Sequence, residues 1–99
     1  YVQSEKRLIK IDIEDIKIIE AKGNFILIKT TNGNHITYSS LKKIESKLPQ
    51  ESFMRVHRSY LINFKKIVDI EDNSVLIGKE IVPISRRFKP QLMERLNRL

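Results

Sequence analysis

Side chains that can bind phosphate or read the edge of a base gather between Arg55 and Asn63, in the sequence R-V-H-R-S-Y-L-I-N. Arginine presents N–H donors in a planar fork that fits phosphate oxygens or guanine O6 and N7, and an asparagine amide fits adenine N6 and N7. Between Arg55 and Lys66 there are four cationic side chains and no carboxylate. A local field of one sign is what attracts a polyanion such as DNA.

Three short segments combine such side chains with small or turn-forming neighbours, so we expect them to project from the fold. They are Lys22-Gly23-Asn24, His57-Arg58-Ser59 and Ser85-Arg86-Arg87. Ordinary structural explanations remain open. Arg58 could be a solvated surface charge, and Asn63 could cap a turn or satisfy buried backbone. His57 lies at helical spacing with Phe53, Val56, Tyr60 and Leu61, which is also typical of a buried, hydrogen-bonded core histidine.

The sequence gives little support for catalysis or metal binding. His57 and Ser59 are too close along the chain to expect proton-transfer geometry, and no oxyanion hole is evident. The two histidines, His35 and His57, lack metal-ligand spacing, and there are no cysteines. No glycine-rich phosphate loop is present. We therefore expect no enzymatic activity, no metal and no cofactor.

Composition indicates one soluble globular domain spanning residues 1–99. No apolar run approaches the roughly 20 residues that span a bilayer, so we expect no membrane partner. The lack of cysteine fits a cytoplasmic location. The chain starts at Tyr1 rather than Met, which favours a domain taken from a longer protein. The net charge of +7 suits nucleic acid, anionic lipid or an acidic protein.

The elements that must position these side chains are mostly β-strands, about seven in all. The expected strands are Leu8–Ile13, Ile16–Ala21, Phe25–Thr31, Asn34–Tyr38, Ile67–Ile70, Val75–Ile77 and Ile81–Ile84. Asn32-Gly33 predicts a hairpin, as does the turn at residues 71–74. Pro83 should lie at a sheet edge or end its strand, because proline cannot donate a ladder hydrogen bond.

Two helices complete the expected fold. Residues 41–48 predict a short amphipathic helix with Ser39 or Ser40 as N-cap and Pro49 as its stop. Pro90 fits the first turn of a C-terminal helix, whose apolar stripe would be Leu92, Leu96 and Leu99. Two helices this far apart cannot form a helix-turn-helix, so any DNA must be read by loops.

The stretch FMRVHRSYLIN resembles the signature of the LytTR-type (LytR/AlgR-type) DNA-binding domains of bacterial transcription regulators. Glu20 followed by a glycine-containing loop is similar to the first half of such a domain. The I-x-x-I at Ile67 and Ile70, and V-P-I-S-R-R at residues 82–87, are similar to its end. The resemblance implies elongated antiparallel β-sheets with one short internal helix and a C-terminal helix.

The resemblance also implies a function. Loops would enter successive major grooves on one side of duplex DNA, with Asn24, Arg58 and Arg86 as the base-contacting residues. Residues implied to contact phosphate or to support the site are Lys22, Arg55, His57, Ser59, Ser85, Arg87 and Lys89. Such domains are typically the output domain of a response regulator, C-terminal to a receiver domain, and commonly bind paired repeats as two protomers.

Two alternatives to duplex DNA binding remain. A binder of RNA or single strands needs exposed aromatic side chains for stacking, and most of the seven aromatics here fall at positions typical of a core. A basic module for an acidic protein partner would need only the charge. Competition by plain duplex DNA separates these classes.

Overall fold

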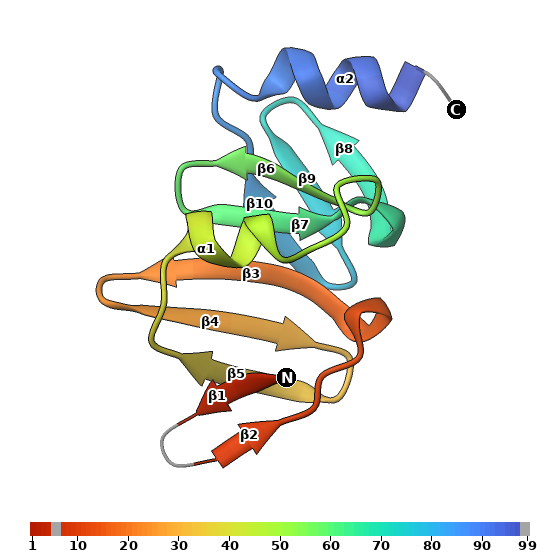
Figure 1. Cartoon of the computed structure of the whole chain (residues 1–99). Coiled ribbons are helices and arrows are strands. Elements are labelled where there is room, and N and C mark those ends of the chain that lie inside the picture. The colour runs from red at the N-terminus through yellow and green to blue at the C-terminus, as the bar shows by residue number, and fades with distance from the viewer. Residues whose placement is uncertain (5–6, 98–99) are drawn as a thin grey trace.

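The computed structural model describes the backbone of residues 1–4 and 7–97, and the side chains of Tyr1 and residues 8–97. Within these residues, ten strands form three antiparallel sheets (Figure 1). The shape is elongated, 42 × 23 × 23 Å. The predicted mostly β fold, with antiparallel sheets, an internal helix and a C-terminal helix, is confirmed.

The largest sheet has five strands. In spatial order they are β5 (Gly33–Thr37), β4 (Phe25–Thr30), β3 (Ile16–Lys22), β7 (Tyr60–Asn63) and β6 (Phe53–His57). The three-stranded sheet contains β10 (Glu80–Pro83), β9 (Ser74–Ile77) and β8 (Ile67–Glu71). A small hairpin pairs β1 (Val2–Ser4) with β2 (Arg7–Ile9). The helices are α1 (Leu41–Ser46) and α2 (Lys89–Asn97), and single 3₁₀ turns span Ile13–Asp15 and Phe64–Lys66.

The five-stranded sheet is buried on both faces at its centre. Consecutive residues of β3, Ile18 and Ile19, point to opposite faces and are at most 1% exposed, and Leu61 and Ile62 do the same in β7. One core lies between this sheet, the three-stranded sheet and α2, and the other lies beneath α1. The continuous apolar runs of these strands, rather than strict alternation, follow from burial on both sides.

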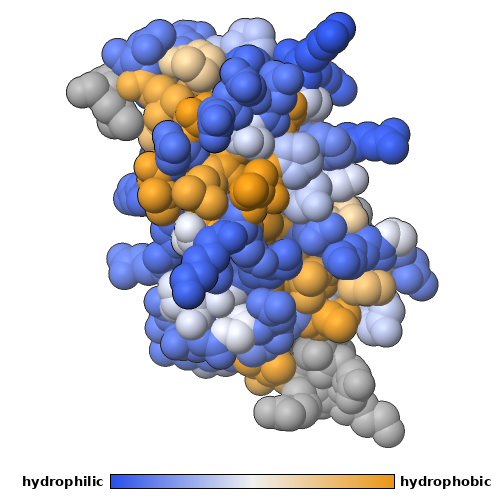
Figure 2. All heavy atoms as spheres, turned by 180° about the vertical axis from the view of Figure 1, so that it is seen from behind, coloured by the Kyte–Doolittle hydropathy of each residue, from blue (hydrophilic) through white to orange (hydrophobic). Residues whose placement is uncertain are grey.

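The three-stranded sheet buries only its inner face. Val75, Ile77 and Val82 belong to the first core, whereas Ile81 is 72% exposed and Val68 65% exposed. Figure 2, seen from behind, shows hydrophobic area over the upper half of the molecule, where this sheet lies. Hydrophobic side chains therefore remain in contact with solvent on its outer face.

Both helix predictions are confirmed where they can be checked. The Ser40 Oγ accepts a hydrogen bond from the Lys43 N–H at 3.2 Å, which makes Ser40 the N-cap of α1. Lys42, Lys43 and Lys47 are exposed to solvent. In α2, Pro90 is the second residue and Leu92 is fully buried, with Leu96 packed beside it. Leu99 lies outside the described residues.

The predicted hairpins form, with small shifts. The β4–β5 turn is Thr31-Asn32 rather than Asn32-Gly33, because the Thr30 Oγ1 accepts from the Asn32 N–H and donates to the Gly33 carbonyl. Gly33, with φ +125°, then starts β5. The β8–β9 turn lies within residues 71–74 as expected. Pro83 both ends β10 and lies on an edge strand.

Three sequence expectations were wrong. There are ten strands rather than seven among the described residues, because the signature stretch forms two strands and residues 2–4 form another. The run Leu8–Ile13 is strand only as far as Ile9, since the chain turns at Ile13 to enter β3. Of the seven aromatic side chains, Phe53 is buried and Tyr60 and Phe64 pack partly buried against the first core, so fewer lie in the core than expected.

Asn63 satisfies buried backbone at the end of β7. Its side chain is 4% exposed, its Nδ2 donates to the Ile16 carbonyl at 2.9 Å, and its Oδ1 accepts from the Lys65 N–H at 3.0 Å. The amide therefore joins β3 to the 3₁₀ turn that follows β7. This is the structural role considered for Asn63 from the sequence.

We expect Asn63→Ala to lower the free energy of unfolding by about 1–3 kcal/mol, because it leaves a buried carbonyl and an N–H without a partner. Urea unfolding measures the change. The matched control is Asn34→Ala on β5, where the amide is exposed and the change should stay within about 0.5 kcal/mol. Equal effects of the two substitutions would contradict this role.

Candidate nucleic-acid interface

The antiparallel pairing of β3 with β7 places two of the predicted turns at one end of the sheet. Glu20 near the end of β3 pairs with Tyr60 at the start of β7, and the Ala21 N–H donates to the Ser59 carbonyl at 2.8 Å. The β3–β4 turn and the β6–β7 turn therefore lie side by side. Since neighbouring strands are about 4.8 Å apart, the centres of these two hairpins are separated by about 10 Å.

The third segment, Ser85–Arg87, lies on the same side of the molecule because it is hydrogen-bonded to β6. The Ser85 N–H donates to the Val56 carbonyl at 2.8 Å, so the chain between β10 and α2 passes beside the β6–β7 turn. In Figure 1 the three segments follow one another up the left side of the molecule. We call this surface the three-turn face: residues 22–24, 57–59 and 85–87.

The β3–β4 connection is a tight two-residue turn at Gly23 and Asn24. Lys22 pairs directly with Phe25, and Gly23 has φ +62°, a left-handed conformation that glycine adopts without strain. The side chains of Lys22 and Asn24 are exposed. This turn therefore presents one cation and one amide to solvent on a rigid hairpin.

The β6–β7 turn is held by its own side chains. The Ser59 N–H donates to His57 Nδ1 at 3.1 Å, and the His57 ring lies edge-on to Tyr60 at 5.6 Å between ring centres. Because Nδ1 accepts, the neutral ring carries its proton on Nε2. His57 is half-buried and belongs to neither core, so it shapes the turn, while Arg58 at the tip is exposed.

The segment Ser85–Arg87 is a turn that leads into α2. The Ser85 carbonyl accepts from the N–H groups of Phe88 and Lys89, both at 3.1 Å. Arg86 and Arg87 are exposed, and the Arg87 guanidinium lies 5.4 Å from the centre of the Phe88 ring. The Ser85 Oγ is buried without a hydrogen-bond partner among the described residues.

Two further predicted phosphate contacts lie outside the turns. Lys89 starts α2, is half-buried and donates through Nζ to the Asn73 Oδ1 at 3.3 Å. Arg55 lies on β6, where its Nε is 3.8 Å from the Glu45 Oε1 of α1. The structure thus brings the other candidates together on the three-turn face, whereas Lys89 lies at the start of α2 and Arg55 is held against α1.

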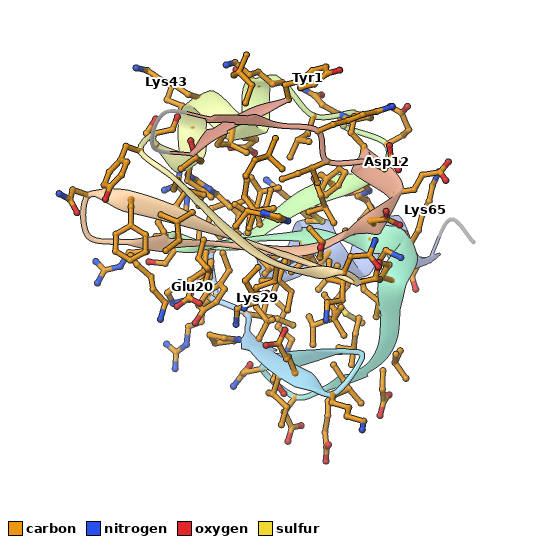
Figure 3. All side chains as sticks on the ribbon, turned by 90° about the horizontal axis from the view of Figure 1, so that it is seen from below. Tyr1, Asp12, Glu20, Lys29, Lys43 and Lys65 are labelled. Atoms are coloured by element: carbon orange, nitrogen blue, oxygen red, sulfur yellow. The ribbon has the colours of Figure 1, made fainter. Side chains whose placement is uncertain are left out.

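A half-buried polar cluster joins strands that lead into or out of the three turns. It joins Glu20 of β3, Lys29 of β4, Tyr60 of β7 and Glu80 of β10. The Tyr60 hydroxyl donates to Glu20 Oε2 at 3.1 Å, and Lys29 Nζ is 3.7 Å from Glu20 Oε1 and 3.1 Å from Glu80 Oε1. Figure 3 shows Glu20 and Lys29 next to each other.

The surroundings of two cluster members raise their pKa values. Burial raises the pKa of the Tyr60 hydroxyl, and the hydrogen bond to Glu20 and the charge of that carboxylate add to the effect. For Lys29, burial alone would lower the pKa of the ammonium. The hydrogen bond to Glu80 and the charges of Glu80 and Glu20 outweigh burial, so the pKa of Lys29 is raised.

Comparison with known proteins identifies the fold's family. The family model described as the LytTr DNA-binding domain matches residues 6–97. The chain belongs to the LytTr DNA-binding domain family. The sequence resemblance is thereby confirmed, and the LytTr assignment covers all three segments of the three-turn face.

Relatives of this LytTr domain include the sensory transduction protein LytT of Bacillus anthracis, 38% identical over 98 residues, covering 93% of this chain and 40% of that protein. The transcriptional regulatory protein YpdB of Escherichia coli is 32% identical over 89 residues, covering 83% of this chain and 36% of YpdB. The chain thus spans about two-fifths of the length of these relatives.

A solved structure shares the fold. The LytTr DNA-binding domain of a putative methyl-accepting/DNA response regulator from Bacillus cereus superposes with a TM-score of 0.83 at 23% identity. The match covers 96% of this chain and 93% of that one. Within the described part of the LytTr domain, no cluster of three or more His, Asp or Glu side chains could hold a metal ion. No helix there is long and apolar enough to cross a membrane.

The polar cluster is the part of the LytTr site that sequence reasoning missed. Glu20 and Lys29 each stand in an otherwise apolar strand, I-I-E-A and L-I-K-T, and such isolated charges are the signal that could have pointed to them. Their partner Glu80 is 51 residues from Lys29 along the chain. That contact depends on how the two sheets pack, which no local pattern specifies.

The raised pKa values predict a loss of stability at high pH. A folded-state pKa above the unfolded value contributes stability below the unfolded pKa, near 10 for tyrosine, and that stability is lost as pH rises through the folded value. We therefore expect the stability advantage of the wild type over Tyr60→Phe, measured by urea unfolding, to shrink above about pH 10. The control Ser46→Ala, which removes a hydroxyl bonded to the Lys43 carbonyl, should show a difference independent of pH. A constant Tyr60→Phe difference from pH 8 to 11 would contradict the assignment.

Proposed function

We propose that this LytTr domain binds duplex DNA sequence-specifically by laying the three-turn face along one side of the double helix. DNA binding is the activity that defines its family. The observation that carries the proposed mode is the convergence of three rigid turns on one side of the molecule. Loops must do the reading, because neither helix belongs to a helix-turn-helix.

Charge and exposure support this assignment of the face. Lys22, Arg58, Arg86 and Arg87 are exposed there. The carboxylates closest along the strands, Glu20 and Glu80, are already engaged by Lys29. The face therefore offers cations free to neutralise phosphates, which supplies most of the affinity for any duplex.

Base reading is assigned to Asn24, Arg58 and Arg86, which lie in the three turns. Each good bidentate contact discriminates against a wrong base by about 1–3 kcal/mol. The supporting and phosphate-contacting residues are Lys22, Arg55, His57, Ser59, Ser85, Arg87 and Lys89. The longest dimension of the molecule is 42 Å, so the domain as a whole is long enough to lie along one helical turn of DNA, about 34 Å.

The wider context forms part of the proposal. The chain matches about two-fifths of its LytT relatives, which supports a role as the non-enzymatic output domain of a longer cytoplasmic response regulator with an N-terminal receiver domain. Two protomers would bind paired repeats. Selection from a random duplex library tests this directly, because enriched sites should contain a spaced, repeated half-site.

One observation favours a second candidate, single-strand binding. Tyr38 is 70% exposed and packs edge-on against Phe25, the residue after Asn24, at 6.5 Å between ring centres. An exposed aromatic beside a basic turn is what stacking on an unpaired base uses. Competition at physiological salt distinguishes the two functions, since duplex should displace a labelled selected site far better than either single strand.

Truncating the base-reading arginines tests the assignment. We expect Arg58→Ala and Arg86→Ala each to weaken binding to the selected site by about 5- to 150-fold, equivalent to 1–3 kcal/mol, while binding to random duplex changes little. Lys47→Ala on the exposed surface beyond α1 is the matched control and should leave the preference unchanged. Equal losses on selected and random duplex would show that these arginines contact phosphate only.

Salt dependence tests the phosphate contacts. If four to six phosphates are neutralised per protomer, log K should fall with log salt concentration with a slope of about −4 to −5. Fluorescence anisotropy between 50 and 300 mM salt measures the slope. A slope near zero would argue against DNA as the partner.

A further inference from the structure

The polar cluster of Glu20, Lys29, Tyr60 and Glu80 has a member on at least one strand next to each turn of the three-turn face. Glu20 lies three residues before Gly23 of the β3–β4 turn, and Tyr60 follows the β6–β7 turn directly. Glu80 starts β10, the strand that leads to Ser85 and Arg86. Lys29 bridges the two carboxylates, and thereby links the five-stranded sheet to the three-stranded sheet.

We propose that this cluster is a positioning site that sets the spacing of the three turns, and so the sequence preference of the domain. The inference rests on the proposed function. Its members do not contact DNA themselves; they act through the turns in front of them.

A continuous set of contacts leads from the cluster to the Arg58 turn. Glu20 Oε2 accepts from the Tyr60 hydroxyl, the Tyr60 ring supports the His57 ring, and His57 Nδ1 accepts from the Ser59 N–H. The Ser59 carbonyl is held from the other side by the Ala21 N–H. Ser59, the residue after Arg58 in the turn, is therefore held by hydrogen bonds at both its N–H and its carbonyl.

The ion pair between Lys29 and Glu80 fixes the position of β10, the strand that leads to Arg86. The pair is 3.1 Å apart, and the Lys29 side chain is 20% exposed and the Glu80 side chain 39%, so water screens the interaction only in part. It links β4 to β10 across the gap between two sheets whose other contacts are mostly apolar. Apolar packing is non-directional and permits small sliding, whereas a hydrogen-bonded ion pair fixes a relative position.

Base reading depends on accurate positioning of the arginine side chains. Bidentate recognition requires both N–H groups of a guanidinium to meet their acceptors, and a binding site loses function when its residues are about 1 Å too loose. Partly buried ion pairs contribute little net stability after desolvation. A role in geometry therefore explains the cluster better than a role in stability.

The test uses Tyr60→Phe, which removes only the hydroxyl, and Lys29→Met, which severs both ion pairs. Ser46→Ala is the matched control. Each variant is titrated with three duplexes. They are the selected site, a random duplex, and the selected site with one base pair inserted between the positions read by Arg58 and by Arg86, as mapped with the alanine variants. Glu80→Gln replaces Lys29→Met if that variant fails to fold, as judged by circular dichroism.

We expect Tyr60→Phe and Lys29→Met to weaken binding to the selected site by about 5- to 20-fold, while random duplex changes less than about twofold. The penalty for the inserted base pair should shrink in Lys29→Met, because the two halves of the face can then adjust to it. A merely structural role would lower the unfolding temperature without changing this penalty.

An unchanged preference and an unchanged insertion penalty in both variants would overturn the inference. If Arg58→Ala and Arg86→Ala change the preference in the same assay, the proposed function survives that failure. If those two variants also leave the preference unchanged, the proposed function fails and the positioning role fails with it. The two failures are therefore distinguishable.

Discussion

The antiparallel pairing of β3 with β7 is the constraint on which the rest of this LytTr domain depends. Both strands are buried on their two faces, so a one-residue slip of their register would move every core side chain into the opposite core and disrupt the packing of both. That register puts the end of β3 beside the start of β7, and hence the Asn24 turn beside the Arg58 turn. The Ser85–Val56 hydrogen bond then adds the third turn at the neighbouring edge.

The placement of charge follows from the same arrangement. Burial in the central strands tolerates few ionisable groups, and Glu20 of β3, Lys29 of β4 and Glu80 of β10 are paired with one another. The turns present exposed cations, Lys22, Arg58, Arg86 and Arg87, which water and, in our proposal, phosphate surround. A rigid sheet with cationic turns at one end is suited to binding a long, regular polyanion and not a small ligand.

The sequence predicted the fold class, most strands and the three projecting segments, because alternating patterns, Gly23 and Asn32-Gly33 are local signals. His57 is spaced from its apolar neighbours as in a helix, but residues 53–63 form two strands. Periodicity alone does not distinguish a short helix from a short buried strand. The sequence prediction also missed the pairing of Lys29 with Glu80 and overstated the burial of Tyr38. Those features depend on sheet packing and strand ends, which are set by the whole fold.

The claim that one duplex contacts all three turns can be measured directly by NMR. Titrating the ¹⁵N-labelled chain with the selected duplex should shift the amide resonances of residues 22–24, 57–59 and 85–87 most strongly. Residues on the outer face of the three-stranded sheet, such as Val68 and Ile81, should change little. Strong shifts confined to a single turn, or centred on that outer sheet face, would contradict the account.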